Sequence, residues 1–353
     1  MQKIIHTTKL LKLLDKHQFD EYIRSLAWSP SGDCLAIISA RGELALWQMK
    51  NIDVLQLASN YSLDCVGFSA DGQWLATGGQ EGQIQIRRLT SNSKTFELIS
   101  TLDGGTAWID SLAWNPQSNL LAFAVNREVK IWDANTQKIS ISVDFDVSSV
   151  FSLAWHPQRH LLAASGHGGV KVWHSDNWQK EPYQLKVPGA SLDCAWSYDG
   201  EYLASGNLDR TISLLHWNNP PPWLMQGFPG KVSQVAWSNQ GSKLLLAATC
   251  QEGITIWHFD HQSKNWQSHV LQHQKMVQAI AFFPNSSLLA SAGNDGCIQL
   301  WQQGKKLIQT LKGTTELSCL AWDPTGEYLA AGGQDGKLTI WQMCLATKGC
   351  GNK

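Results

Sequence analysis

The sequence lacks the features that mark several large classes of protein. Its 353 residues include 28 basic and 29 acidic side chains, a net charge of −1, and no long block of charge of one sign. A charge balance of this kind provides no broad electrostatic attraction to nucleic acid or to an acidic membrane. No run of apolar residues approaches the length of about 18 that a membrane-spanning helix needs.

The first 20 residues also lack a secretion signal. They are interrupted by Lys9, Lys12, Asp15 and Lys16, and they contain neither a continuous apolar segment nor a small-residue cleavage site. We therefore expect a cytoplasmic protein with no membrane attachment.

Motifs for metals and cofactors are missing as well. The sequence contains no His-Glu-x-x-His, no Cys-x-x-Cys and no spaced run of acids of the calcium-loop type. Eight cysteines occur at irregular spacing, and most fall in predicted strands, where cysteine acts as a small buried apolar residue. Cys344 and Cys350 lie in the C-terminal tail, and the sequence assigns them no role. We expect no cofactor and no metal.

What the sequence does contain is a repeat. An aromatic residue preceded by small and apolar residues and followed by a turn returns eight times, at intervals of 40 to 46 residues. The eight aromatics are Trp28, Phe68, Trp114, Trp155, Trp196, Trp237, Phe282 and Trp322. A fixed period of this size indicates a stacked repeat architecture.

Each unit is predicted to form four short strands. In the eighth unit, alternating apolar runs at 317–322, 328–332 and 338–341 are separated by turn residues, including the tight pair Asp335-Gly336. A fourth strand follows the third in most units, and it is poorest in the fifth, at Trp223–Met225 after three prolines. No such strand follows residue 341, but residues 9–14 resemble the fourth strand of the seventh unit, 306–311.

The ring is therefore predicted to close through the N-terminus. A strand from residues 1–19 would complete the last unit, and closure would leave only short, protected strand edges. The expected fold is all-β, an eight-bladed β-propeller, with seven blades as the alternative. A single domain spans residues 1–353, divided into the closing strand (1–19), eight repeats (20–341) and a short tail (342–353).

These motifs resemble a known family. Leu-Ala-Trp-Ser-Pro-Ser-Gly at 26–32, Phe-Ser-Ala-Asp-Gly-Gln-Trp-Leu-Ala-Thr-Gly-Gly at 68–79 and Asp-Gly-Lys-Leu-Thr-Ile-Trp at 335–341 are similar to the WD-repeat family of β-propellers. The chain departs from the family pattern in that the Trp-Asp pair at the end of a unit's third strand occurs once, at Trp132-Asp133.

The resemblance also implies a structural hydrogen-bond network. In the family, a His, a Ser or Thr, an Asp and a Trp bond to one another within a blade. Only the seventh unit has all four, namely His273, Ser291, Asp295 and Trp301. Since the family pattern accounts for each position, we interpret the Ser, His and Asp as structural and not as a catalytic triad.

The resemblance further implies a binding face. In the family, the loops before the first strand and between the second and third strands share one face of the disc, here called the top face. The residue four positions before each repeat aromatic often points toward the central opening. Combining those positions with aromatics of the preceding loops gives a predicted partner-binding set of Tyr22, Arg24, Tyr61, Asp64, Trp108, Asp110 and Phe151. Three further loop aromatics are Phe19, Phe145 and Phe228.

The function predicted from these residues is a non-enzymatic scaffold that binds a protein or peptide over units one to four. Aromatic residues and arginine are the residue types that anchor protein interfaces. Two alternatives are an RNA-binding propeller and a small-molecule or metal-dependent propeller enzyme. The charge balance argues against RNA, and the central opening offers only Asp64 and Asp110 as convergent acids. The chain is expected to be a monomer or a subunit of a larger complex.

Overall fold

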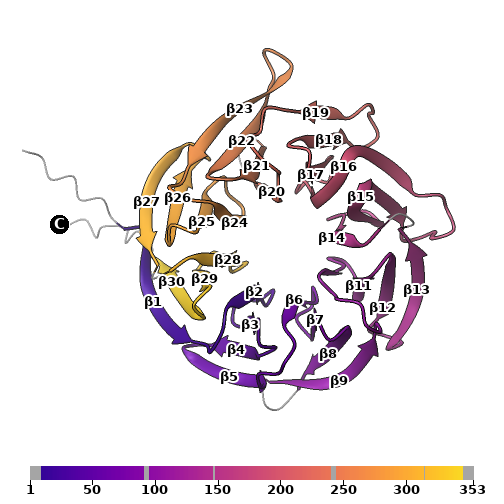
Figure 1. Cartoon of the computed structure of the whole chain (residues 1–353), viewed down its shortest axis with the longest axis vertical. Helices are drawn as coiled ribbons and strands as arrows, with labels where there is room; N and C mark the ends of the chain where they lie inside the picture. Colours follow the sequence, from indigo (N-terminus) through magenta and orange to yellow (C-terminus); the bar gives the residue numbers. More distant parts are fainter. Residues whose placement is uncertain (1–8, 91–94, 146–147, 240–243, 314, 345–353) are drawn as a thin grey trace, which may run out of the picture.

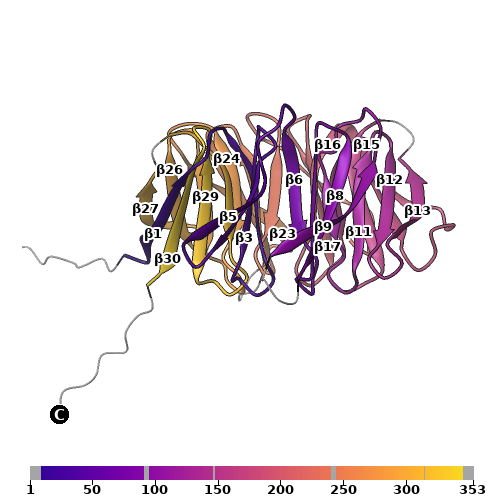
Figure 2. The same ribbon diagram turned by 90° about the horizontal axis from the view of Figure 1, so that it is seen from below.

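The strands form a ring of radial sheets, seen face-on in Figure 1 and edge-on, as a flat disc, in Figure 2. The computed structural model describes residues 9–90, 95–145, 148–239, 244–313 and 315–344. The closing strand is β1 (Leu11–Gln18).

Units one to four contain β2 (Ile23–Trp28), β3 (Leu35–Ser39), β4 (Leu44–Gln48), β5 (Asn51–Gln56), β6 (Leu63–Phe68), β7 (Trp74–Gly79), β8 (Gln83–Leu89), β9 (Phe96–Asp103), β10 (Leu112–Trp114), β11 (Leu120–Val125), β12 (Glu128–Asp133), β13 (Lys138–Asp144), β14 (Val150–Trp155), β15 (Leu161–His174) and the first half of β16 (Tyr183–Trp196). Units five to eight contain the rest of β16 and β17 (Tyr202–Asn207), β18 (Ile212–His216), β19 (Trp223–Met225), β20 (Gln234–Trp237), β21 (Leu245–Cys250), β22 (Gly253–Asp260), β23 (Asn265–Gln272), β24 (Val277–Phe282), β25 (Leu289–Gly293), β26 (Cys297–Gln302), β27 (Lys306–Lys312), β28 (Leu317–Trp322), β29 (Tyr328–Gly333) and β30 (Lys337–Met343).

Among the described residues the strands of the propeller form seven hydrogen-bonded sheets. Six sheets have four strands each, and the seventh has six, in the order β14 to β19. The expectation of eight separate blades is therefore wrong as a sheet count, and the alternative of seven agrees with it. The physical reason is that β15 and β16 are long, with 14 residues each, and run without interruption through two strand positions apiece. Units four and five are thereby merged into one sheet, and no unit is an appendage outside the ring (Figure 1).

The predicted N-terminal closure is confirmed. β1 pairs antiparallel with β30, from Leu11 opposite Met343 to Gln18 opposite Lys337. The side chain of Leu11 is 1% exposed and packs into the core between units seven and eight. The Gln309 amide of β27 adds a link across the neighbouring units, because its oxygen accepts hydrogen bonds from the backbone N–H groups of Leu10 and Leu11 at 2.8 and 3.0 Å.

The core lies between units and not at one centre. One cluster joins Trp74 and Ile84 of unit two to Phe123 and Trp132 of unit three, and the rings of Trp74 and Trp132 meet edge to face at 5.4 Å. The middle strands are buried on both faces, as in β3, whose five residues are all buried. Apolar burial at each joint is the main stabilising contribution.

The repeat aromatic also makes a polar link between units. In six units its indole N–H donates to the backbone carbonyl just before the corresponding aromatic of the preceding unit, at 2.9–3.2 Å. The pairs are Trp28–Ala321, Trp114–Gly67, Trp155–Ala113, Trp196–Ala154, Trp237–Ala195 and Trp322–Ala281. Units two and seven have Phe68 and Phe282 at this position, and a phenyl ring has no N–H to donate.

Those two joints have other polar links. Between units one and two, Arg24 Nε donates to Asp64 Oδ1 at 2.7 Å. Between units six and seven, the Gln234 amide bonds to both backbone groups of Ile280, at 3.0 and 3.4 Å.

In most units a polar side chain at the first position after the repeat aromatic fixes the turn; unit seven has Phe283 there. Ser197 is typical, since its hydroxyl accepts the backbone N–H of Tyr202 at 2.9 Å and donates to Asp199 at 2.6 Å. His156 does the same in unit four through Nδ1, which accepts the N–H groups of Gln158 and Arg159 at 3.0 and 2.9 Å. Such local side-chain bonds to backbone favour turns over continued strand.

Candidate partner-binding face

Three aromatic side chains of the predicted set are exposed at the entries to units two, three and four. Tyr61 is 51% exposed, Trp108 is 60% exposed and Phe151 is 36% exposed. Tyr61 lies just before β6, Trp108 just before β10, and Phe151 is the second residue of β14, where its ring meets His167 edge to face at 5.5 Å. Large apolar groups in water are expected where a protein binds a partner.

The charged members of the set form one electrostatic group. Asp64 is buried, with 3% of its side chain exposed, and it accepts hydrogen bonds from Arg24 and from the Ser62 hydroxyl. Burial lowers the pKa of Arg24, but the hydrogen bond and charge of Asp64 outweigh it, so that the pKa is raised. The two charges therefore neutralise each other.

Asp110 is the unbalanced member of this group. Partial burial and the charge of Asp64 raise the pKa of Asp110, and the charge of Arg24 offsets this only in part. Among the described residues no ion pair to Asp110 is found. One carboxylate thus remains available beside Trp108.

The remaining loop aromatics differ in their surroundings. Tyr22 is half-buried and lies under the Arg24 guanidinium, 5.8 Å from ring centroid to Cζ. Phe19, Phe145 and Phe228 are 5%, 2% and 6% exposed, so these three loop aromatics do not contribute to the surface. They pack with the core clusters between units, because an apolar ring with no polar group is stabilised by burial there.

A partly buried acid on the first strand of unit five was missed by sequence reasoning. Asp193 of β16 accepts the Ser152 hydroxyl of unit four and the Val235 N–H of unit six, each at 2.9 Å. Burial raises the pKa of Asp193 despite these hydrogen bonds. The available signal was an acid three residues before Trp196, where no other unit has one. Asp193 links three units and has a structural role.

The four side chains of the implied network are brought together in unit seven. His273 Nε2 lies 2.7 Å from Ser291 Oγ, His273 Nδ1 lies 3.1 Å from Asp295 Oδ2, and Trp301 Nε1 donates to Ser291 Oγ at 2.9 Å. The His273 side chain is fully buried. The Ser291 hydroxyl is hydrogen-bonded to the Trp301 indole and the His273 imidazole, and Ser291 is fully buried. A nucleophilic serine would need access to a substrate.

We expect His273→Ala to lower the free energy of unfolding by about 1–3 kcal/mol, since buried Ser291 and Asp295 would lose a partner. Burial lowers the pKa of His273, and Asp295 only partly counters this. The folded protein then binds fewer protons than the unfolded chain, so this stabilisation is present above the ordinary histidine pKa of 6.5 and is lost as the pH falls below it. Urea unfolding at pH 8 and pH 5.5 measures both effects. A variant as stable as the parent would contradict the network.

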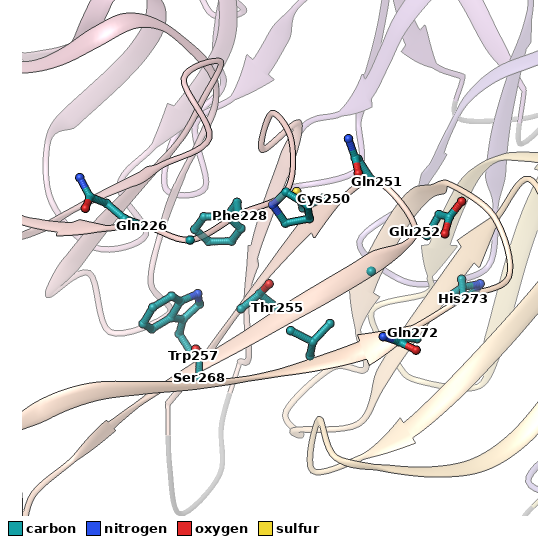
Figure 3. A pocket seen from close by; sticks show the side chains of 14 residues that line it. Gln226, Phe228, Cys250, Gln251, Glu252, Thr255, Trp257, Ser268, Gln272 and His273 are labelled. Atoms are coloured by element: carbon teal, nitrogen blue, oxygen red, sulfur yellow. The ribbon is translucent and has the colours of Figure 1, made fainter.

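A pocket lined in part by His273 does not contain a catalytic arrangement. It has a volume of about 410 Å³ and lies between the segment after β19 and strands β22 and β23 (Figure 3). Phe228 and Trp257 form its aromatic wall, with centroids 6.2 Å apart. Burial raises the pKa of the Cys250 thiol, whose sulfur bonds to Gly230, and His273 is already engaged, which leaves Glu252 as the remaining ionisable lining group. Figure 3 shows Glu252 at the opposite end of the pocket from Trp257.

Two further observations concern sites of other kinds. Within the described ranges, no three His, Cys, Asp or Glu side chains lie close enough to bind a metal ion. No helix in the same part of the chain has the length and hydropathy needed to span a membrane.

Comparison with known proteins identifies the repeat. The family described as WD domain, G-beta repeat matches residues 184–215, 265–302 and 305–342. The related description, anaphase-promoting complex subunit 4 WD40 domain, matches residues 26–104 and 66–158. The chain belongs to the WD-repeat family of β-propeller proteins. WD-repeat propellers generally mediate protein–protein interactions and are generally not enzymes.

Individual relatives match parts of the chain. The human intraflagellar transport protein 122 homolog is 32% identical over 125 residues, which is 35% of this chain and 10% of the relative. THO complex subunit 3 of Arabidopsis thaliana is 24% identical over 239 residues, 67% of this chain and 61% of the relative. The chain therefore spans less than two thirds of the length of either relative.

A solved structure matches almost the whole ring. Sqt1 of Chaetomium thermophilum, solved bound to the N-terminus of ribosomal protein L10, superposes with a TM-score of 0.80 and 17% identity. The superposition covers 92% of this chain and 98% of Sqt1. At this identity the similarity concerns the fold.

Proposed function

We propose that this WD-repeat protein is a non-enzymatic scaffold that binds a peptide segment of another protein on its top face, over units one to four. The observation that carries the proposal is that Tyr61, Trp108 and Phe151 are exposed at the entries to three consecutive units, with the Asp110 carboxylate two residues after Trp108. Together with Tyr22, Arg24 and Asp64 these residues are called the docking patch.

The physical basis is the combination of aromatic area with a rigid support. Aromatic side chains contribute a large buried area with few rotatable bonds, and they dominate the energy of many interfaces. Here Tyr61 and Trp108 project from loops and Phe151 projects from β14, all supported by the closed ring of β-sheets. Loops held by a rigid scaffold commonly present binding residues. Sqt1, which shares the fold, was solved with a bound protein terminus, and this supports a peptide ligand for a propeller of this shape.

We expect a triple variant, Tyr61→Ala, Trp108→Ala and Phe151→Ala, to lose the partners that the parent protein captures from native extract, because each substitution removes an exposed aromatic anchor. Bound proteins would be identified by mass spectrometry, and equal thermal stability would show that folding is retained.

A matched control replaces three exposed apolar residues elsewhere, namely Met49, Leu98 and Tyr198, which are 87%, 53% and 48% exposed. Partners lost in the docking-patch variant and kept in the control support the proposal. Partners kept in both, or lost only in the control, would overturn it. A cytoplasmic location remains a prediction from the sequence alone.

A further inference from the structure

A second surface lies on the rim of the disc, where the chain end closes the ring. A groove of about 490 Å³ runs between β1 of unit eight and β27 of unit seven. Its floor is apolar, formed by Leu11 and Trp341, and Gln309 crosses it to the backbone of Leu10 and Leu11. Figure 1 shows β1 and β27 side by side at the edge of the ring.

The walls of the groove are both apolar and exposed. Leu13 is 54% exposed on the β1 side, and Ile308 is 37% exposed on the β27 side. Leu307, the neighbour of Ile308, is 43% exposed. An apolar floor flanked by exposed aliphatic side chains provides area that a ligand could remove from water.

The charged side chains that line the groove are all basic. Its lining contains Lys9, Lys12 and Lys312 and no aspartate or glutamate. Within the described residues these three lysines have no ion pair. The nearest acid on β1, Asp15, is engaged elsewhere, because its carboxylate accepts the Trp47 indole N–H at 2.7 Å and contacts His17 at 2.8 Å. The whole chain has a net charge of −1, so this concentration of lysine is local.

The ends of this chain are not suitable occupants. Residues 1–8 and 345–353 contain Lys3, Lys348 and Lys353 and no acidic side chain. Charge complementarity therefore favours a ligand from outside, one that brings carboxylates and aliphatic side chains together. A concave groove also fits an extended peptide better than a flat membrane surface.

We propose that the groove between β1 and β27 binds an acidic, leucine-rich segment of a partner protein, with carboxylates at the lysines and aliphatic side chains against Leu13 and Ile308. This surface is separate from the docking patch and does not depend on it. The segment would lie in extended form along the two strands.

Fluorescence anisotropy with a labelled short peptide that alternates glutamate and leucine tests the proposal. We expect saturable binding that weakens with added salt and weakens at least about tenfold in the double variant Lys12→Glu, Lys312→Glu, because attraction becomes repulsion. The variant Leu13→Ser, Ile308→Ser should also weaken binding, and the peptide with glutamine in place of glutamate should bind poorly.

The matched control is Lys138→Glu with Lys186→Glu, which makes the same charge change on exposed outer strands across the ring. Binding that is unchanged in this control supports a specific groove. No saturable binding by the parent protein, or equal weakening in both lysine pairs, would overturn the proposal. A second arm measures binding to vesicles that contain phosphatidylserine. If the Lys12→Glu, Lys312→Glu variant loses vesicle binding but keeps peptide binding, the groove is a membrane site and the peptide proposal is wrong.

Discussion

Replacing Asp193 with alanine is expected to lower the free energy of unfolding by about 2–3 kcal/mol. The substitution leaves the buried Val235 N–H and the Ser152 hydroxyl without their acceptor, and unsatisfied buried donors are costly. It also removes a link that joins units four, five and six. Urea unfolding monitored by tryptophan fluorescence measures the loss.

Asp193→Asn is the matched control. Its carbonyl oxygen can accept the Val235 N–H and its amide can donate to Ser152, so most of the stability should be retained. The two proteins should then differ in pH dependence. Burial raises the pKa of Asp193, so the folded state binds a proton more tightly than the unfolded chain does.

The contribution of Asp193 is therefore most favourable below its ordinary pKa of 3.8 and declines as the pH rises through the raised value. The asparagine variant should lack this decline. An alanine variant as stable as the parent, or an asparagine variant with the same pH profile, would show that the carboxylate does not stabilise the ring as described.

Deleting residues 1–18 is expected to prevent stable folding. The deletion removes β1, exposes the β30 edge and uncovers the core around Leu11, which is 1% exposed. Burial of one leucine contributes about 2–3 kcal/mol, and the paired backbone adds to it, so the total approaches the whole stability of a typical domain. Loss of a cooperative thermal transition would be the readout.

Deleting residues 1–8 is the control, because it leaves β1 complete, and we expect its melting temperature to match that of the parent. A synthetic peptide of residues 9–18 should restore a cooperative transition to the longer deletion. If the protein without residues 1–18 melts like the parent, the closing strand is dispensable and the pairing of β1 with β30 contributes little.

Much of the fold could be predicted because each unit repeats one pattern of apolar alternation and turn residues. The recurring Leu-Ala-Trp set the first strand, and the resemblance of residues 9–14 to 306–311 predicted the closure that β1 makes with β30. The merging of units four and five was not predictable, since strand continuity through 161–174 and 183–196 depends on hydrogen-bond register and not on composition.

The candidate site was harder to predict for a physical reason. Sequence places an aromatic residue in a loop but does not say whether its ring turns toward water or toward the neighbouring unit. Tyr61 and Trp108 are exposed, whereas Phe145 and Phe228 are buried. Similarly, the sequence places Arg24 and Asp64 in the predicted partner-binding set but does not show that they form an ion pair across a joint.

That joint ties recognition to the integrity of the ring. The joint between the first two units lacks the indole bond, which Phe68 cannot make, and the Arg24–Asp64 pair is one of the polar links that join them. The same pair lies inside the proposed docking patch. A ligand that competed for the Asp64 carboxylate would weaken the joint between units one and two. A ligand that left the ion pair intact and contacted both Tyr61 and Tyr22 would stabilise that joint. The partner's affinity and the free energy of unfolding would then be thermodynamically linked, so that a change in one would change the other.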